Sequence, residues 1–449
     1  MSLLTFENLW VNGSWQADAT VEVASGERSE YIRGLTLPGI ASAHCHAFQR
    51  ILPAWTQRAR GADDSFWTWR STLYAAAAAM GPAELEAITA RCYLDLLRGG
   101  YTGVAEFLYL HRLGAPADDP PNADQAVARA AQRVGIPLTL LPALYQHSDF
   151  GRAPPTPAQL PFTRSTACFA RDWSELRRRY AGDPSVTLGI AFHSLRAVDI
   201  ETIEAVCGGP AADPACRVLH IHASEQTGEV RACQRHWNRA PIELLLQHRL
   251  LDPRWTIVHG THATQAELDG IRECGATLAV CPTTEADLGD GCLDAAQFFL
   301  RSGHLAVGSD SNICCNAFAE LRLLEWSQRL LHRRRNVLAS PSEPSVADGL
   351  YRTARASGWR SLGKPQRNDP RPAAADFVTF DDEAVDWRQQ PPENYLSAIM
   401  FASGEPRACH VMVDGRWLIR DGVHAAEAEI ESQYRAALAR LRPSLLQAQ

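Results

Sequence analysis

A regular alternation of short apolar runs with longer helical segments is the feature that most constrains the fold of this chain. Eight runs rich in Leu, Ile, Val and Ala lie at 34–42, 101–107, 137–145, 186–193, 217–223, 255–260, 276–282 and 304–310. Because these runs are continuously apolar, they predict parallel strands that are buried on both faces and covered by helices. Eight strand-plus-helix units predict an α/β fold closed as a distorted (β/α)8 TIM barrel, with an open doubly wound sheet as the alternative.

The two ends of the chain follow a different pattern. Both alternate apolar and polar residues around turn signals, which is typical of short antiparallel strands. We expect the two ends to meet in one small β-sandwich, followed by a C-terminal helix with amphipathic periodicity. The predicted domains are a β-sandwich from 1–36 and 365–425, a (β/α)8 barrel over 37–364, and a C-terminal helix over 426–449.

Length and composition exclude several classes of protein. The chain has 449 residues, of which 46% are hydrophobic and 21% charged, so it can bury a sizeable core and is neither disordered nor collagenous. Its 44 Lys and Arg against 51 Asp and Glu give a net charge of -7, so no global basic field attracts nucleic acid or an anionic membrane. Without a signal-peptide pattern or a membrane-length apolar run, the sequence predicts a soluble, cytoplasmic protein.

Cysteine and lysine usage narrows the chemistry further. The 12 cysteines are scattered and none has C-x-x-C spacing, so neither a disulfide framework nor a cysteine-rich zinc module is indicated. Lys364 is the only lysine in the sequence. Schiff-base chemistry and lysine metal ligands are therefore nearly excluded.

Polar residues gather at the carboxyl ends of the predicted strands, where barrel enzymes assemble their active sites. An H-x-H pair alone is more often a surface or core feature than a metal site. Here four different strand ends supply a histidine or an aspartate, and imidazole with carboxylate is a ligand set that borderline cations favour. These residues are His44 and His46 after the first strand, His220, His222 and Glu225 at the fifth, His259 and His262 at the sixth, and Asp310 at the eighth.

Four motifs carry a family resemblance: LPGIASAHCHAFQR, HIHASEQ, VHGTH and VGSDS. Together they resemble the amidohydrolase superfamily, in the mononuclear deaminase branch, over nearly the whole chain. Binuclear members of that superfamily use a carboxylated lysine at the end of strand four, where this chain has none. The resemblance implies one divalent metal ion, expected to be Zn²⁺. Its implied ligands are His44, His46, His222 and Asp310, with His259 nearby and Glu225 as a proton shuttle.

Further motifs narrow the resemblance to the formimidoylglutamate deiminase family. FWTWR and FHSLRAV are the most specific, and AEFLYLH, ASEQTGEV and CPTTEADLGDG accompany them. The family implies hydrolysis of N-formimino-L-glutamate to N-formyl-L-glutamate and ammonia, as in histidine degradation, by a homodimer. Two places depart from the family pattern, Cys45 and the loop 311–316, and both could alter the pocket mouth. The implied residues for binding the dianionic substrate are Gln49, Arg70, Tyr109, His193 and Arg196.

The implied chemistry assigns separate roles to three residues. A metal held by imidazoles and a carboxylate lowers the pKa of a bound water to about 7, and the hydroxide would attack the formimidoyl carbon. Asp310 would take the proton of the water. Glu225 would relay a proton to the leaving nitrogen, and His259 would stabilise the attacking oxygen.

Simpler interpretations exist for single residues. His220 shares a face with the implied ligand two residues later, but is expected to be structural. Taken alone, Arg70 is best explained as a cation–π stack on Trp67 or Trp69, and Glu225 as a solvated loop carboxylate.

Two other functions stay open. One is deamination of another amidine or heterocyclic amine of the same superfamily, and the other is a non-catalytic barrel that binds a metal or an anion. Arg70 and Arg196 argue against the first, because a neutral purine or triazine needs no such cations. Glu225 and His259 argue against the second, because a structural metal site needs no proton shuttle.

Overall fold

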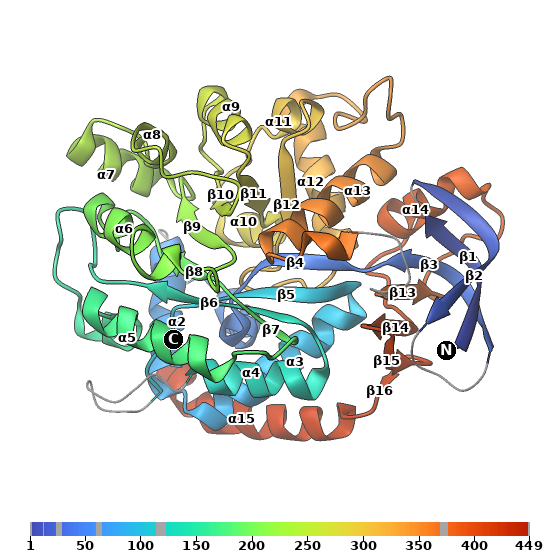
Figure 1. The fold of residues 1–449 in the computed structure, drawn as a ribbon, viewed down its shortest axis with the longest axis horizontal. Helices are drawn as coiled ribbons and strands as arrows, with labels where there is room; N and C mark the ends of the chain where they lie inside the picture. The colour runs from blue at the N-terminus through green and yellow to red at the C-terminus, as the bar shows by residue number, and fades with distance from the viewer. Residues whose placement is uncertain are drawn as a thin grey trace.

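A parallel barrel wrapped by helices forms the body of the molecule, and a second sheet lies beside it (Figure 1). The computed structural model describes residues 2–11, 13–23, 29–59, 65–113, 123–368 and 376–447. The barrel strands run in the order β12-β11-β10-β9-β8-β6-β5-β4, with β7 also paired to β6, and every pair is parallel. Their bounds are β4 (Ile40–Cys45), β5 (Tyr101–Leu108), β6 (Leu138–Leu144), β7 (Val186–Leu188), β8 (Ile190–Phe192), β9 (Leu219–Ala223), β10 (Trp255–His259), β11 (Thr277–Val280) and β12 (His304–Val307).

Barrel closure occurs just beyond the ends of β4 and β12. Cys45 and Asp310 form an isolated parallel bridge. The backbone N–H of His46 donates to the carbonyl of Asp310 at 2.9 Å, and the N–H of Asp310 donates to the carbonyl of His44 at 3.0 Å. Each of the eight predicted runs contains a strand of this sheet, so the predicted barrel is confirmed.

Helices cover the outside of the barrel and follow local capping signals. At the start of α12, for example, the side chain of Asn316 accepts the N–H groups of Phe318 and Ala319. The α-helices are α1 (Pro53–Thr56), α2 (Phe66–Ala79), α3 (Pro82–Arg98), α4 (Ala123–Val134), α5 (Thr166–Arg179), α6 (Ile200–Cys207), α7 (Thr227–Trp237), α8 (Pro241–Gln247), α9 (Gln265–Glu273), α10 (Pro282–Leu288), α11 (Ala296–Leu300), α12 (Ala317–His332), α13 (Val346–Ser361), α14 (Tyr395–Ser397) and α15 (Glu427–Gln447). Shorter helical turns are η1 (Ala47–Ile51), η2 (Pro157–Phe162), η3 (Pro210–Ala212), η4 (Pro365–Asn368), η6 (Pro392–Asn394) and η7 (Ala398–Ala402).

The second sheet joins the two ends of the chain, as the sequence predicts. Its seven strands form one hydrogen-bonded sheet in the order β16-β15-β14-β13-β3-β1-β2. The strand β3 pairs parallel to β1 and antiparallel to β13, and this connects the N-terminal and C-terminal parts. The predicted domain limits stay a prediction, and 369–375 of the range 365–425 lie outside the described residues. The strands are β1 (Ser2–Val11), β2 (Ser14–Val23), β3 (Glu30–Pro38), β13 (Phe377–Phe380), β14 (His410–Val413), β15 (Arg416–Arg420) and β16 (Val423–His424).

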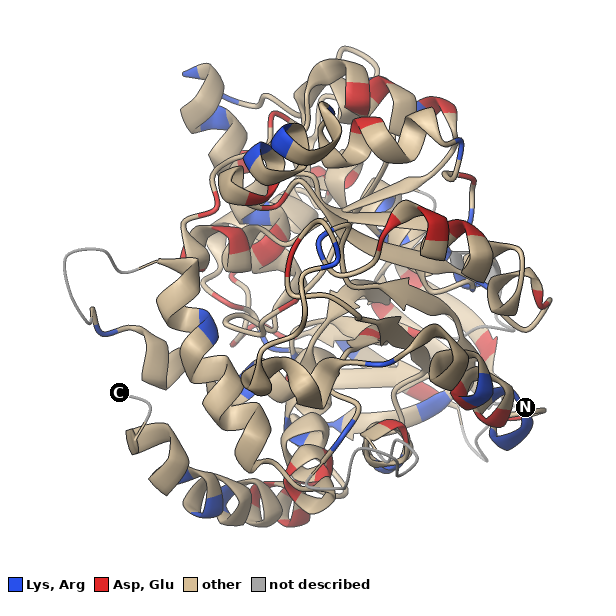
Figure 2. Cartoon of the chain, turned by 90° about the vertical axis from the view of Figure 1, so that its left-hand side faces the viewer, with Lys and Arg blue, Asp and Glu red and all other residues tan. Residues whose placement is uncertain are grey.

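Charged residues of both signs are interspersed on the helices of the face that Figure 2 displays. Many of them pair, for example Arg133 with Glu86 at 2.8 Å and Arg177 with Asp213 at 2.7 Å. A search of the described residues finds no helix with both the length and the apolar character needed to cross a membrane.

Gly39 divides the first predicted run, 34–42, between the two sheets. The structure assigns residues up to Pro38 to β3 and residues from Ile40 to β4, so the run is two strands and not one. A Cβ atom at Gly39 would lie 1.9 Å from Thr102 Oγ1. The backbone carbonyl of Gly39 also accepts the indole N–H of Trp359 at 3.1 Å. The close approach of β4 and β5 at this junction therefore requires glycine.

Substitution Gly39→Ala is expected to destabilise the protein by about 1–3 kcal/mol, because the added methyl overpacks a site with no free space. Urea unfolding measures this difference. Gly404→Ala is the control, since a Cβ atom there meets nothing within 4 Å. Equal stability of the two variants would contradict the expected overpacking.

Candidate metal centre and active site

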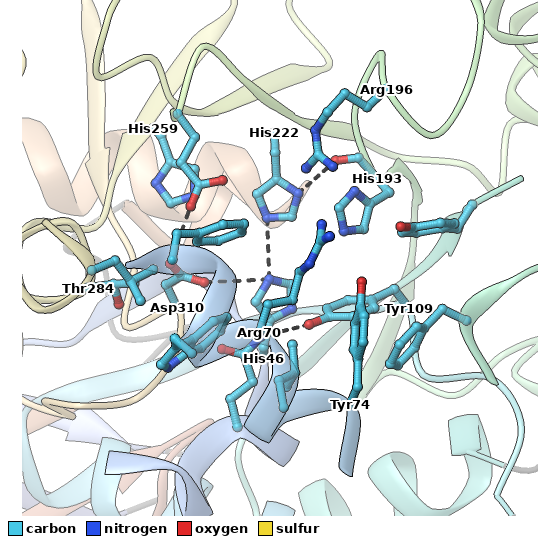
Figure 3. A pocket seen from close by; sticks show the side chains of 18 residues that line it. His46, Arg70, Tyr74, Tyr109, His193, Arg196, His222, His259, Thr284 and Asp310 are labelled. Atoms are coloured by element: carbon cyan, nitrogen blue, oxygen red, sulfur yellow. Dashed lines mark hydrogen bonds and ion pairs between the residues drawn. The ribbon is translucent and has the colours of Figure 1, made fainter. Parts of the chain in front are cut away.

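The predicted site residues converge at the carboxyl ends of the barrel strands (Figure 3). His44 lies on β4, with His46 just beyond it, and His222 lies on β9. His259 ends β10 and Asp310 follows β12. All five side chains are buried, with at most 7% of each residue exposed. The parallel barrel thus brings together residues from four separate strand ends.

Three imidazoles form the centre of the cluster. The Nε2 atom of His44 lies 3.1 Å from the Nε2 atoms of both His46 and His222, and these last two are 3.3 Å apart. The Nδ1 atom of His46 donates to the carbonyl of Phe107 at 2.8 Å, and that of His222 donates to the carbonyl of His193 at 2.8 Å. Because these bonds hold the protons on Nδ1, both Nε2 atoms present lone pairs to the same point.

Asp310 completes this donor set. Its Oδ1 atom lies 3.3 Å from Nε2 of His44 and 3.5 Å from Nε2 of His46. Four ligand atoms about 2.0–2.2 Å from one ion, at tetrahedral angles, lie about 3.3–3.6 Å from one another. The observed separations of 3.1–3.5 Å are close to that arrangement. A divalent cation therefore fits these residues in both spacing and chemistry.

Burial and charge shift the pKa values of these ligands in the direction that favours metal binding. Burial lowers the pKa of His46 to about 3, and nearby His44 adds to the effect. Burial alone would raise the pKa of Asp310, but the hydrogen bond and charge of His44, together with the charge of His259, hold it below its usual range. Neutral imidazole and ionised carboxylate are the states that bind a metal.

His259 lies beside the three imidazoles and is surrounded by three carboxylates. Its Nδ1 atom is 3.3 Å from Glu285 Oε1, and its Nε2 atom is 3.7 Å from Glu225 Oε1 and 3.9 Å from Asp310 Oδ2. Burial alone would lower the pKa of His259, but these carboxylates raise it to about 10. Burial raises the pKa of Glu225, while His259 opposes the shift. This arrangement combines a charged imidazole with a carboxyl group that retains its proton more readily than usual.

The backbone around the cluster adopts left-handed conformations that side chains other than glycine rarely take. The φ angle is +70° at His259 and +43° at Asp310, and it is +57° at Ser224 and +60° at Asn312. Asn312 stabilises this local geometry, because its Nδ2 atom donates to the carbonyls of His46 at 3.0 Å and Asp310 at 2.9 Å. Such strain is commonly found where side chains must be aimed at a site.

A cavity of about 600 Å³ opens onto the cluster. Most of the predicted site residues line it, while His44 is fully buried beneath. Neither Cys45 nor the loop 311–316 is among its lining residues, so these departures from the family pattern lie away from the pocket wall. The predicted residues that line the cavity are His46, Gln49, Arg70, Tyr109, His193, Arg196, His222, Glu225, His259 and Asp310.

Two arginines reach the cavity without a direct ion pair to any described carboxylate. Burial raises the pKa values of Glu225 and Glu229, and the charge of Arg196 opposes this rise. Among the described residues, neither Arg70 nor Arg196 forms an ion pair or a hydrogen bond to a side chain. The guanidinium of Arg70 stacks on Trp67 at 4.3 Å and lies 5.4 Å from the ring of Tyr74. The predicted cation–π stack and the predicted cavity position of Arg70 therefore both occur.

Uncharged polar groups occupy the wall between the arginines and the imidazoles. Gln49 donates from Nε2 to the hydroxyl of Tyr109 at 2.8 Å. The Oε1 atom of Gln49 is buried and has no hydrogen-bond partner among the described residues. Burial lowers the pKa of His193, and the charge of Arg196 lowers it further. The neutral His193 ring packs edge-on against Tyr109, with 5.3 Å between the ring centroids.

Eight further residues line the cavity that the sequence analysis did not identify. Tyr145 ends a predicted strand and Thr284 follows another, so the strand-end rule could have found both. Trp69 stands beside Arg70 in the FWTWR motif of α2, which could have indicated it, whereas no local pattern connects Phe162 of η2 to the site. His220 lies outside the cluster and hydrogen-bonds the carbonyl of Ser361 at 2.9 Å. The eight are Phe66, Trp69, Leu73, Tyr74, Tyr145, Phe162, Thr284 and Leu288.

A buried carboxyl group that supports the first ligand pair was also missed. Glu106 on β5 is 1% exposed and accepts the N–H of Ala47 at 2.9 Å and the hydroxyl of Tyr93 at 3.0 Å. Glu106 and the neighbouring carbonyl of Phe107 therefore fix the backbone and the ring of the segment that contains His46. The burial of Glu106 in a continuous apolar strand gave no sequence signal of this role.

Comparison with known proteins agrees with this geometry. The model of the amidohydrolase family matches residues 35–418. The formimidoylglutamate deiminase of Pseudomonas aeruginosa is 38% identical over 408 residues, covering 90% of this chain and 89% of that protein. A crystal structure of an amidohydrolase from Brucella melitensis has a TM-score of 0.90 at 33% identity, covering 98% of this chain and 100% of that one. The zinc complex of atrazine chlorohydrolase from Arthrobacter aurescens, at 18% identity and a TM-score of 0.81, shares the fold.

The barrel, the histidine-rich centre and these matches define a metal-dependent hydrolase of the TIM-barrel type. The chain belongs to the amidohydrolase family.

Substitution His222→Asn is expected to reduce the bound metal far below the parent content of about one divalent ion per chain, because it removes one of four ligands. Elemental analysis of the purified protein measures the metal. His220→Asn is a matched control, since it changes the same residue type two positions earlier on the same strand. Equal metal content in the two variants would exclude His222 as a ligand.

Proposed function

We propose that this protein hydrolyses N-formimino-L-glutamate to N-formyl-L-glutamate and ammonia. The observation that carries the proposal is the pair Arg70 and Arg196, two cations that form no direct ion pair among the described residues, in the same cavity as the imidazole cluster. A substrate with two carboxylates supplies the missing partners. The similarity to a formimidoylglutamate deiminase over most of the chain supports the same reaction.

The proposed cofactor is one divalent metal ion, Zn²⁺, held by His44, His46, His222 and Asp310. When bound, this ion supplies Lewis acidity that lets a water molecule lose its proton near neutral pH. The fixed Nδ1 hydrogen bonds of His46 and His222 keep their Nε2 atoms ready to bind it. The lack of a lysine near these residues supports a single ion.

Three residues manage the protons of the reaction. Asp310 is a strong candidate to accept the proton of the water, because its carboxylate borders both the imidazoles and the cavity. Glu225 carries a raised pKa, so it can hold a proton and deliver it to the leaving nitrogen, which then departs as ammonia. His259, charged at neutral pH, can donate a hydrogen bond to the attacking oxygen.

The two arginines of the cavity can also attract an anionic substrate to a protein whose net charge is negative. A protein with a net charge of -7 repels a dianion at long range. Guanidinium groups bind carboxylates with two parallel hydrogen bonds, and low-dielectric walls strengthen this attraction. Aromatic residues of α2 and η2, such as Trp69 and Phe162, provide such walls. Gln49, Tyr109 and His193 are proposed to complete the hydrogen bonds to the substrate.

An ammonia-release assay on N-formimino-L-glutamate, with and without added zinc, tests the proposal. We expect stoichiometric ammonia and N-formyl-L-glutamate, activity loss after chelation, and recovery with zinc. Turnover of a neutral heterocyclic amine in place of this substrate would overturn the assignment in favour of another deaminase. A zinc-dependent homodimer in the cytoplasm also stays a prediction.

Substitution Glu225→Gln is expected to lower kcat by about 10²–10⁴ while the metal content stays at the parent level, because it removes a general acid–base and no ligand. Steady-state kinetics and elemental analysis of the same sample separate the two effects. Asp310→Asn is the comparison, since it should lose metal and activity together. Near-normal turnover in Glu225→Gln would assign the proton transfer to another group.

Substitution Arg196→Ala or Arg70→Ala is expected to cut kcat/KM by about 30-fold or more, because it leaves a substrate carboxylate buried without its cation. The metal content should not change. Arg171→Ala, at a side chain that is 63% exposed, is the control and should behave like the parent. A substrate analogue amidated at its side-chain carboxylate shows which arginine binds which carboxylate. The ratio of kcat/KM for the substrate to that for the analogue should be smaller in the variant that lacks the arginine facing this carboxylate. Parent-like kinetics in both variants would refute dianion binding.

A further inference from the structure

A second cavity, of about 500 Å³, lies outside the barrel between helices α4 and α5. Residues of β5, β6 and the segments that follow them form its remaining walls. It shares no lining residue with the active-site cavity. Leu108, Pro142, Phe169 and Leu176 make much of its surface apolar.

Arg164 supplies a buried cation to this second cavity. Its side chain is 2% exposed, yet its Nε and Nη2 atoms have no hydrogen-bond partner among the described residues. The Oδ2 atom of Asp172 lies 3.2 Å from Nε, but the orientation is not that of a hydrogen bond, and Oδ2 is likewise without a partner. Asp172 thus forms an ion pair with Arg164 but leaves these two donors without a hydrogen bond, and buried donors normally meet an acceptor.

Other donors around this cavity are also unused. The indole N–H of Trp173, which lines the cavity, is buried and without a partner within the described part of the chain, and so is Nε of the neighbouring Arg112. The carboxylate of Asp124, in contrast, already accepts a hydrogen bond from Arg179 at 2.6 Å. Unused donors therefore outnumber unused acceptors, which favours an anion as the ligand.

We propose that this cavity is a second ligand site that binds a small carboxylate with a short apolar tail. The carboxylate pairs with Arg164, and with Trp173 where its indole N–H is in reach, and the tail contacts Leu108 and Phe169. Guanidinium and indole N–H groups suit a planar carboxylate, while the apolar walls disfavour a fully hydrated inorganic ion.

The same two chain segments, around His111 and Arg164, contribute residues to the walls of both cavities. The N–H groups of His111 and Arg112 both donate to the carbonyl of Pro161 at 3.2 Å, and the N–H of Arg164 donates to the carbonyl of Tyr145 at 2.9 Å. Tyr145 lines the active-site cavity, as do residues two positions before His111 and Arg164. A ligand bound at Arg164 thus contacts the rear of the active-site wall.

Butyrate is the probe for this site, measured by ligand-detected NMR titration. The protein carries Arg70→Met and Arg196→Met, so that neither guanidinium of the active-site cavity can bind the probe, and the change caused by the Arg164 variant then reports on the second cavity alone. In that background we expect saturable butyrate binding in the millimolar range. Adding Arg164→Met should weaken it by about tenfold or more, the scale for losing a hydrogen bond to a charged group. Adding Arg178→Met, at an exposed arginine of α5 that does not line the cavity, should leave it unchanged.

Further measurements keep the test decisive. Trp173→Phe removes a single N–H and is expected to weaken butyrate binding about threefold, which gives a second reading should Arg164→Met fail to fold. Formate, which has no apolar tail, should bind at least about tenfold more weakly than butyrate. Absence of saturable butyrate binding in the background protein would overturn the proposal. Binding unaffected by both Arg164→Met and Trp173→Phe, or equal binding of formate and butyrate, would overturn it too.

Discussion

The hydrogen-bonded closure between the ends of β4 and β12 is the constraint on which the rest of the structure depends. The same few residues close the sheet and form the candidate site, since the backbones of His44, His46 and Asp310 bond to one another while their side chains meet at the candidate metal centre. A barrel that failed to close would separate the carboxylate from the imidazoles. The positions of these side chains therefore depend on the closure of the barrel. Asn312 stabilises this closure, because its side chain donates hydrogen bonds to the carbonyls of both His46 and Asp310.

The closure of the barrel also determines how charge is distributed around the site. Lone pairs of His46 and His222 converge within 3.3 Å, an arrangement that is unfavourable unless a cation lies between them. Beside it, His259 is charged because carboxylates surround it. The cavity thus has the candidate metal centre at its floor and guanidinium groups further out. A ligand with an electrophilic carbon at one end and carboxylates further along suits that distribution.

Much of this site follows from the sequence because residues at the ends of parallel strands converge whatever the details of packing. That rule predicts His44, His222, His259 and Asp310 from one sequence. It fails where position depends on long-range packing: Phe162 reaches the cavity from a helical turn whose own sequence has no periodic signal. Likewise, the apolar run at 34–42 is continuous in sequence, and only the close approach of Thr102 to Gly39 divides it between two sheets.

The pairing of β3 with β13 has a consequence for the order of folding. Thr36 and Thr379 share a hydrogen bond across the two strands although they are 343 residues apart in the chain. During synthesis, β3 emerges early and has no C-terminal neighbour until almost the whole barrel has left the ribosome. Contacts of such sequence separation form late, because the entropy of closing the intervening loop comes first. The strand β4, which continues directly from β3 and carries His44, is therefore held at its start through a pairing with β13 that forms late, and at its end through the bonds to Asp310.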